Sequence, residues 1–127
     1  MRSLLVLLVL MPVAALAEIV TVDFVKVLNG NTDEAVYFYE NNWKPYRAEA
    51  AKRGYISSYR LLVRRSDEGA TNILLITGYA SEAQYEDREA NFAEVMSGSR
   101  EGGPKLMNEK TPGEFREVVD GGVFFGE

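Results

Sequence analysis

Residues 19–28, IVTVDFVKVL, decide how this chain must fold. Branched and apolar side chains occupy both sides of the expected strand, with Val25 and Val27 on one face and Val22 and Phe24 on the other. A strand with one face in water alternates apolar and polar residues, whereas a strand that is apolar on both faces needs cover on both. The stretch therefore predicts a strand in a sheet that is buried from two sides.

The segment that follows predicts a long helix over about residues 32–53. Asn31 stands where an N-cap belongs, with Glu34 three residues on, a spacing typical of a capping box. Gly54 suits the left-handed position that ends a helix. Apolar and aromatic residues at helical spacing form one stripe along it: Val36, Tyr39, Trp43, Tyr46 and Ala50.

Pro45 lies inside this helix and needs its own explanation. A proline there removes one backbone hydrogen bond, to the carbonyl of Asn41, at a cost of about 3 kcal/mol. We expect a kink that widens the gap between helix and sheet, because the apolar stripe continues in register to Ala50. The alternative is a helix that breaks into two segments near Lys44.

Further along the chain, residues 55–64 and 72–80 predict two more strands. Residues 82–97 predict a second helix, which Ser81 and Gln84 would open as a capping box.

The C-terminal part begins with an excursion, residues 97–113, that is rich in glycine, proline and serine. Whether it is a lid, a dimer arm or a plain loop stays open. Residues 114–125 predict a last strand, with Gly121 and Gly122 as a bend or bulge. A short helix over residues 114–119 is the competing interpretation.

The order of these elements, β-α-β-β-α-β, is that of a ferredoxin-like α+β fold. Such a fold places two helices on one face of a four-stranded antiparallel sheet and leaves the other face bare. Because the strands are apolar on both faces, we expect a second copy of the chain to cover the bare face, so that two chains form an α/β barrel.

Over residues 19–97 the chain resembles the dimeric α/β-barrel superfamily of small bacterial proteins. The segments that carry the resemblance are NNWKPYRAEAAKRG, YISSYRLL, ILLITGYAS and AQYEDREANF. The resemblance implies a homodimer with pockets between helices and sheet. Members of the superfamily include cofactor-free monooxygenases, haem-degrading enzymes, small-ligand-responsive proteins and proteins without an assigned activity.

Histidine and cysteine are both absent from the chain. It therefore lacks the usual haem ligand, the usual zinc ligands and any Ser-His-Asp or Cys-His arrangement. Neither a glycine-rich phosphate motif nor a calcium loop occurs. We expect no metal and no cofactor. The net charge of −5 argues against nucleic acid and anionic membranes as partners.

The candidate ligand site combines the aromatic stripe of the first helix with two residues of the second strand. Its residues are Tyr39, Trp43, Tyr46, Tyr59 and Arg60. Rings with hydroxyl tips suit a flat apolar ligand, although such a stripe also serves as plain core. Asp23 lies inside the first strand, where an unpaired charge is costly. We expect it either to form an ion pair with Arg60 or to project from a strand edge into water. Arg60 could also anchor a ligand.

Three functions stay open at this point. The leading hypothesis is a domain that binds a small apolar or aromatic ligand, or serves as an interaction module, without metal or haem. The alternative is a cofactor-independent monooxygenase acting on an aromatic substrate; some such members of the superfamily use Trp, Asn and Arg, the residue types of Trp43, Asn42 and Arg60. The third is a structural dimer with a filled core.

The first 17 residues have the features of a secretory signal peptide. Arg2 supplies a positive start, residues 4–16 are almost wholly apolar, and Ala15 and Ala17 stand at the −3 and −1 positions of a cleavage site. The apolar run is shorter than the roughly 20 residues that span a membrane. We expect cleavage after Ala17, one domain over residues 18–127, and a periplasmic or secreted protein without a stable membrane anchor.

Overall fold

The computed structural model describes residues 3, 18–66, 68–98 and 102–127. The expected signal peptide lies outside the described residues, apart from Ser3. The strands form one antiparallel sheet in the order β2-β3-β1-β4. They are β1 (Ile19–Val27), β2 (Ser58–Val63), β3 (Ile73–Tyr79) and β4 (Arg116–Phe125). This order confirms the predicted ferredoxin-like α+β fold.

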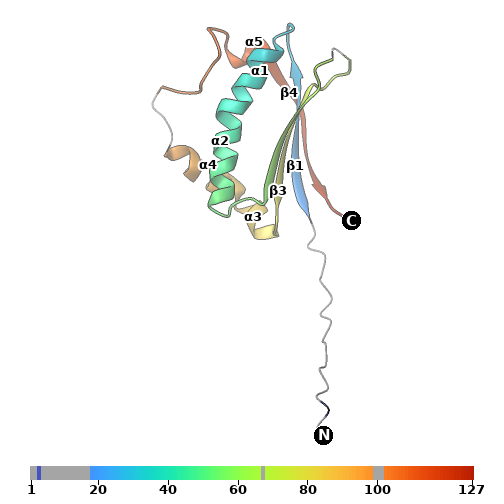
Figure 1. Cartoon of the computed structure of the whole chain (residues 1–127), viewed down its shortest axis with the longest axis vertical. Coiled ribbons are helices and arrows are strands. Elements are labelled where there is room, and N and C mark those ends of the chain that lie inside the picture. Colours follow the sequence, from blue (N-terminus) through green and yellow to red (C-terminus); the bar gives the residue numbers. More distant parts are fainter. Residues whose placement is uncertain (1–2, 4–17, 67, 99–101) are drawn as a thin grey trace.

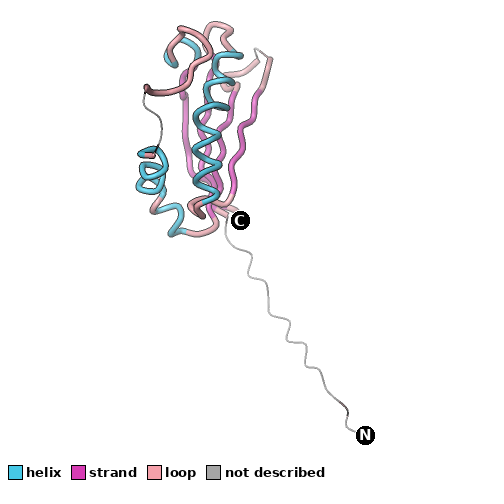
Figure 2. The backbone as a smooth tube through the Cα atoms, turned by 60° about the vertical axis from the view of Figure 1, so that its left-hand side comes forward, coloured by secondary structure: helices cyan, strands magenta, loops and turns pink. Residues whose placement is uncertain are grey.

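The helices lie on one side of the sheet (Figure 1). They are α1 (Thr32–Phe38), the π-helical turn η1 (Tyr39–Trp43), α2 (Lys44–Lys52), α3 (Glu82–Glu86), α4 (Arg88–Ser97) and the single turn α5 (Pro112–Phe115). α1, η1 and α2 join into one rod that runs along the sheet, and α4 lies beside α2 (Figure 2). The second helix is thus interrupted at Asp87, and the competing C-terminal helix is present only as the turn before β4.

The two ends of the rod differ in how well the sequence predicted them. Gly54 has a φ of 77°, and its amide and that of Tyr55 donate to carbonyls of the last helical turn, so the predicted left-handed end is confirmed. The predicted capping box at Asn31 was wrong, because its side chain makes no capping hydrogen bond. It donates instead to the carbonyl of Glu114 at 3.2 Å, an interaction with the turn before β4.

A π turn absorbs Pro45. α1, η1 and α2 follow one another without interruption, so the helix does not break near Lys44. The amide of Lys44 donates to the carbonyl of Tyr39, five residues back, and the turn is wider than an α-helical one. Such a turn inserts one extra residue into a helix, and it places this irregularity directly before the proline.

Asparagine side chains complete the hydrogen bonding of this turn. Nδ2 of Asn41 donates to the carbonyl of Tyr37 at 2.8 Å, and Nδ2 of Asn42 donates to the carbonyl of Phe38 at 2.7 Å. Buried carbonyls that lose good backbone partners are costly unless another donor reaches them. The π turn accommodates Pro45, and the side chains of the two asparagines stabilise it.

The core lies between the rod and the strands β2, β3 and β1. Its side chains come from both layers and are nearly inaccessible to solvent: Ile19, Val25, Ala35, Val36, Tyr39, Ala50, Ile56, Ile73, Leu75, Tyr79, Val95 and Phe115. Each large apolar side chain buried in this way stabilises the fold by about 1.5–3 kcal/mol.

The opposite face of the sheet is also apolar, as the sequence predicted. Strand register places these residues on it: Val20, Val22, Phe24, Leu62, Leu74, Ile76 and Phe124. The rings of Phe24 and Phe124 meet edge to face at 6.5 Å. In Figure 1 every labelled helix lies on the other side of the sheet, so no described helix covers this face.

The irregularity of β4 does not lie at its glycines. The register of β1 and β4 shifts between Phe24 and Val25, opposite Val119. Gly121 pairs regularly with Asp23, and a Cβ added at Gly121 would lie 3.1 Å from the carboxylate. The predicted bulge at the glycines was therefore wrong, and Gly121 leaves room for the side chain of Asp23.

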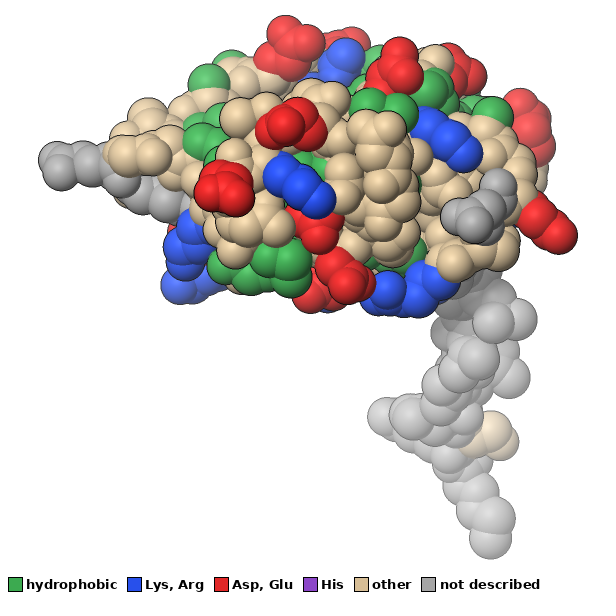
Figure 3. Space-filling model, turned by 90° about the horizontal axis from the view of Figure 1, so that it is seen from above, with side chains coloured by type: hydrophobic (Ala, Val, Ile, Leu, Met, Phe, Trp, Pro, Cys, Tyr) green, Lys and Arg blue, Asp and Glu red, His purple; other side chains and the backbone are tan. Residues whose placement is uncertain are grey.

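The surface seen from above carries acidic and basic side chains intermixed, with small apolar areas between them (Figure 3). Within the described ranges, no helix has both the length and the apolar character that crossing a membrane takes.

Candidate functional site

A cavity of about 620 Å³ opens between the rod, α4 and the returning excursion. Its wall is mostly apolar and rich in aromatic rings, and this volume falls in the range of about 300–1,000 Å³ that is usual for small-molecule sites. The lining residues are Phe38, Tyr39, Asn42, Trp43, Tyr46, Arg47, Phe92, Val95, Met96, Gly103 and Pro104.

One wall of the cavity is the strap, residues 102–111, which is the part of the excursion after residues 99–101. The amide group of Asn42 holds it by two hydrogen bonds of 2.8 Å, one to the carbonyl and one from the amide of Lys105. Leu106 packs on the core next to this point. The side chain of Asn42 thus joins the π turn to the strap.

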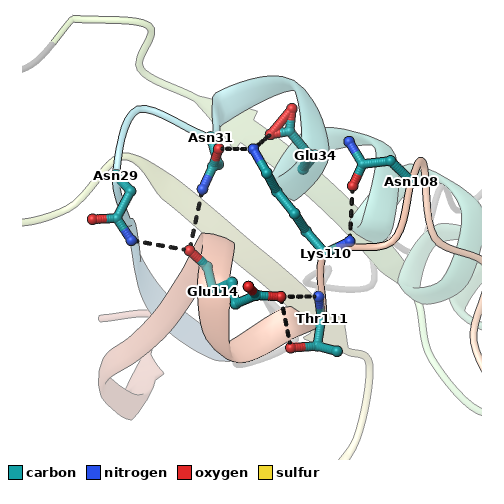
Figure 4. A network of polar contacts seen from close by, with 7 residues as sticks. All are labelled: Asn29, Asn31, Glu34, Asn108, Lys110, Thr111 and Glu114. Atoms are coloured by element: carbon teal, nitrogen blue, oxygen red, sulfur yellow. Dashed lines mark hydrogen bonds and ion pairs between the residues drawn. The ribbon is translucent and has the colours of Figure 1, made fainter.

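A polar network fastens the other end of the strap to the start of α1 (Figure 4). Nζ of Lys110 donates to Oδ1 of Asn31 at 2.8 Å and lies 3.8 Å from the carboxylate of Glu34. The carboxylate of Glu114 accepts from the amide of Thr111 at 2.7 Å, and this hydrogen bond lowers the pKa of Glu114. The strap is therefore held at both ends.

Arg47 carries the only guanidinium among the described residues that line this cavity. Its Nε donates to Oγ1 of Thr77 at 3.0 Å. Its Cζ lies 3.9 Å from the ring centroid of Phe92 and 5.2 Å from that of Trp43. Burial lowers the pKa of Arg47, against the opposing influence of Tyr79 and Asp23. A partly buried cation at the end of an apolar cavity is the main electrostatic feature of the site.

A second hollow, of about 400 Å³, adjoins the cavity, and Arg47 and Phe92 line both. It lies between α4 and the strands β1 and β4, and we call it the cleft. Its other lining residues are Thr21, Asp23, Tyr79, Arg88, Glu89, Gly121, Gly122 and Val123. Small and polar side chains on this part of the sheet leave the cleft unfilled. Burial raises the pKa of Asp23, and Arg47 opposes that shift.

Tyr39 places a buried hydroxyl at the cavity, without a hydrogen-bond partner among the described residues. Burial raises the pKa of Tyr39 to about 12, against the opposing influence of the neighbouring Arg116 guanidinium. The Nε of Arg116 is likewise buried without a partner in the described part of the chain. The hydroxyl of Tyr39 and the guanidinium of Arg116 are thus close neighbours inside the protein.

The structure brings together three of the predicted site residues: Tyr39, Trp43 and Tyr46 line the cavity. Tyr59 lies behind Trp43, with ring centroids 6.2 Å apart, and is not part of the lining. Arg60 pairs with Ile76 and therefore lies on the open face of the sheet.

The ion pair between Asp23 and Arg60, one of the two expectations for Asp23, was wrong, and both residues are exposed. Asp23 pairs with Leu75, which is buried under the helices, so its side chain lies on the helix side, opposite to Arg60. The cation near Asp23 is Arg47. Sequence reasoning missed Arg47, although its position four residues after Trp43 places it on the same stripe of the helix.

The described residues contain no group of three or more acidic side chains that could hold a metal ion.

Comparisons with known proteins give little beyond the fold. No protein-family model matches the sequence, and no curated protein matches it. One similar solved structure is a crystal structure from Bacteroides fragilis, described as a dimeric protein of unknown function and ferredoxin-like fold. The two chains share 12% sequence identity at a TM-score of 0.48, over 87% of this chain and 95% of the other.

Proposed function

We propose that this chain is an exported protein that binds a small ligand with a flat, apolar body in the cavity beside Trp43. The observation that carries the proposal is the cavity of about 620 Å³, with its aromatic wall and its docked strap. A filled core, as expected of a purely structural dimer, does not account for such a space.

The arrangement of side chains favours binding over oxygen chemistry. Trp43, Asn42 and Arg60 are the residue types that the monooxygenase hypothesis pointed to, and Arg60 lies on the open face of the sheet, away from the cavity. The amide of Asn42 is engaged by the backbone of Phe38 and Lys105. A binding site needs only the shape and the apolar wall that the cavity offers.

Titration with the neutral probe N-phenyl-1-naphthylamine tests the proposal, with Trp43, the chain's single tryptophan, as the reporter. Met96 lines the cavity and is 54% exposed, so Met96→Glu should weaken binding at least about tenfold, because it places a charge beside an apolar ligand. Met107→Glu is the matched control, since Met107 is 48% exposed and not part of the lining. Absence of binding to the wild-type protein, or equal effects of the two variants, would contradict the proposal.

We also propose a homodimer in which the open faces of two sheets pack on each other. The support is the row of apolar side chains on that face. Ile76→Glu should convert the dimer to a monomer in sedimentation experiments. Val118→Glu is the control, because Val118 pairs with Val25 and so belongs to the helix side. A wild-type monomer at micromolar concentration would refute the dimer.

Export is proposed from the N-terminal sequence features alone. Expression with a secretion pathway and mass spectrometry of the exported chain should give a mature protein that begins at Glu18. A protein that keeps Met1, or stays in the cytoplasm, would contradict this proposal.

A further inference from the structure

The guanidinium of Arg47 has unused hydrogen-bonding capacity where the cavity meets the cleft. Its Nε donates to Thr77, but its two terminal nitrogens make no hydrogen bond to any described residue. No carboxylate among the described residues lies within 4.0 Å of them. Arg47 is partly buried, and a cation that is partly removed from water is stabilised when an anion reaches its free nitrogens.

Two aromatic rings hold this guanidinium in place. Phe92 and Trp43 flank it, and the hydrogen bond to Thr77 fixes its inner edge. A guanidinium that is already oriented presents its terminal nitrogens as a planar fork, and that fork matches the two oxygens of a carboxylate. Little conformational entropy is then lost when a carboxylate binds.

The charges around the cleft limit the charge of such a ligand. Asp23 and Glu89 line the cleft together with Arg88, whose Nη1 donates to the carbonyl of Tyr85 at 2.9 Å. Two carboxylates therefore oppose the two guanidinium groups of Arg47 and Arg88. This balance accommodates one negative charge beside Arg47 but disfavours a dianion such as a phosphate monoester.

We infer that the ligand is an aromatic or apolar monocarboxylate, whose carboxylate binds the terminal nitrogens of Arg47 while its apolar body fills the cavity beside Trp43. This inference rests on the proposed binding function and specifies its ligand class. It assigns the anchoring role to Arg47 in place of Arg60.

Calorimetric titration with a matched pair of probes, 2-naphthoate and the neutral 2-naphthamide, tests the inference. The wild-type protein should bind the carboxylate at least about tenfold more tightly than the amide, which is the expected gain from hydrogen bonds to a charged group. In Arg47→Met this preference should vanish, so that the two probes bind with equal affinity. Arg60→Met, which removes a guanidinium from the open face, should leave the preference intact.

The outcomes separate the two proposals. If neither probe, nor the neutral naphthylamine, binds the wild-type protein, the proposed function fails and the inference with it. If the amide binds as tightly as the carboxylate, or if Arg47→Met keeps the preference, the inference fails and the binding function stands. Should Arg47→Met not fold, the wild-type comparison of the two probes still decides, because it needs no variant.

Discussion

The space between the helices and the sheet has two halves that differ in how they are filled. Under α1, the strands present Val25, Ile73 and Leu75, and these side chains are almost fully buried. Toward β4 and α4, β1 presents Thr21 and Asp23 to the same side, and they line an open cleft.

The difference lies in the side chains and not in the backbone. Both halves belong to one regular antiparallel sheet, and β1 runs through both. In the first half large apolar residues fill the space to the density of a protein interior. In the second half Gly121 contributes no side chain and Asp23 contributes a charge, and a hollow remains between this part of the sheet and helix α4. The helix layer is thus filled under α1 and left hollow beside Thr21 and Asp23.

The largest effect is expected when an aromatic ring is removed from the filled half. Phe115 is 1% exposed and packs against Phe38, with ring centroids 5.5 Å apart. Phe115→Ala should lower the free energy of unfolding by about 3–5 kcal/mol, measured by urea denaturation. Phe125→Ala removes the same ring from a position that is 62% exposed and should cost far less. Equal losses for the two variants would show that the halves do not differ.

A second test acts at the boundary between the halves, where Asn42 holds the strap. Asn42→Ala leaves the backbone amide and carbonyl of Lys105 without their partner, so it should cost about 1–3 kcal/mol. It should also speed hydrogen exchange at the amide of Lys105. Asn41→Ala removes the neighbouring amide, which donates to the carbonyl of Tyr37 within the rod, and should leave that exchange rate unchanged. Unchanged protection of Lys105 in Asn42→Ala would show that the strap is held elsewhere.

The smallest effect on stability is expected at Asp23, in the hollow half. Its pKa in the folded protein is raised above 3.8, so the folded state disfavours the ionised carboxyl. As the pH rises from 3 through the raised pKa, the wild-type protein should lose stability relative to Asp23→Asn, and the difference should level off above it. Urea denaturation at a series of pH values measures this difference. A difference that changes in the opposite direction would mean that the attraction by Arg47 outweighs burial.

The filled half could be read from the sequence, because its signals are local. Apolar residues on both faces of the strands, the helical stripe and Gly54 predicted the element order and the sheet. Those patterns depend only on the period of a strand or helix.

The site could be read only in part. Tyr39, Trp43 and Tyr46 were predicted from the stripe, but the bond between Asn42 and Lys105 joins residues 63 positions apart, and no local pattern announces it. The register between strands places Asp23 and Arg60 on opposite faces, and register is not visible in either strand alone. Arg47 was missed because a cation on a helix is usually read as part of its solvated face.

The π turn has a consequence for how this protein tolerates changes in length. Deleting one residue from an α-helix rotates everything after it by about 100° and destroys the match between its apolar face and the core. Residues 39–43 already contain one residue more than an α-helical path requires. A single deletion there would keep the faces of α1 and α2 toward the sheet, at the cost of placing Pro45 inside an unbroken α-helix. The rod can therefore change length at its centre, beside the ligand cavity, without a rearrangement of the core.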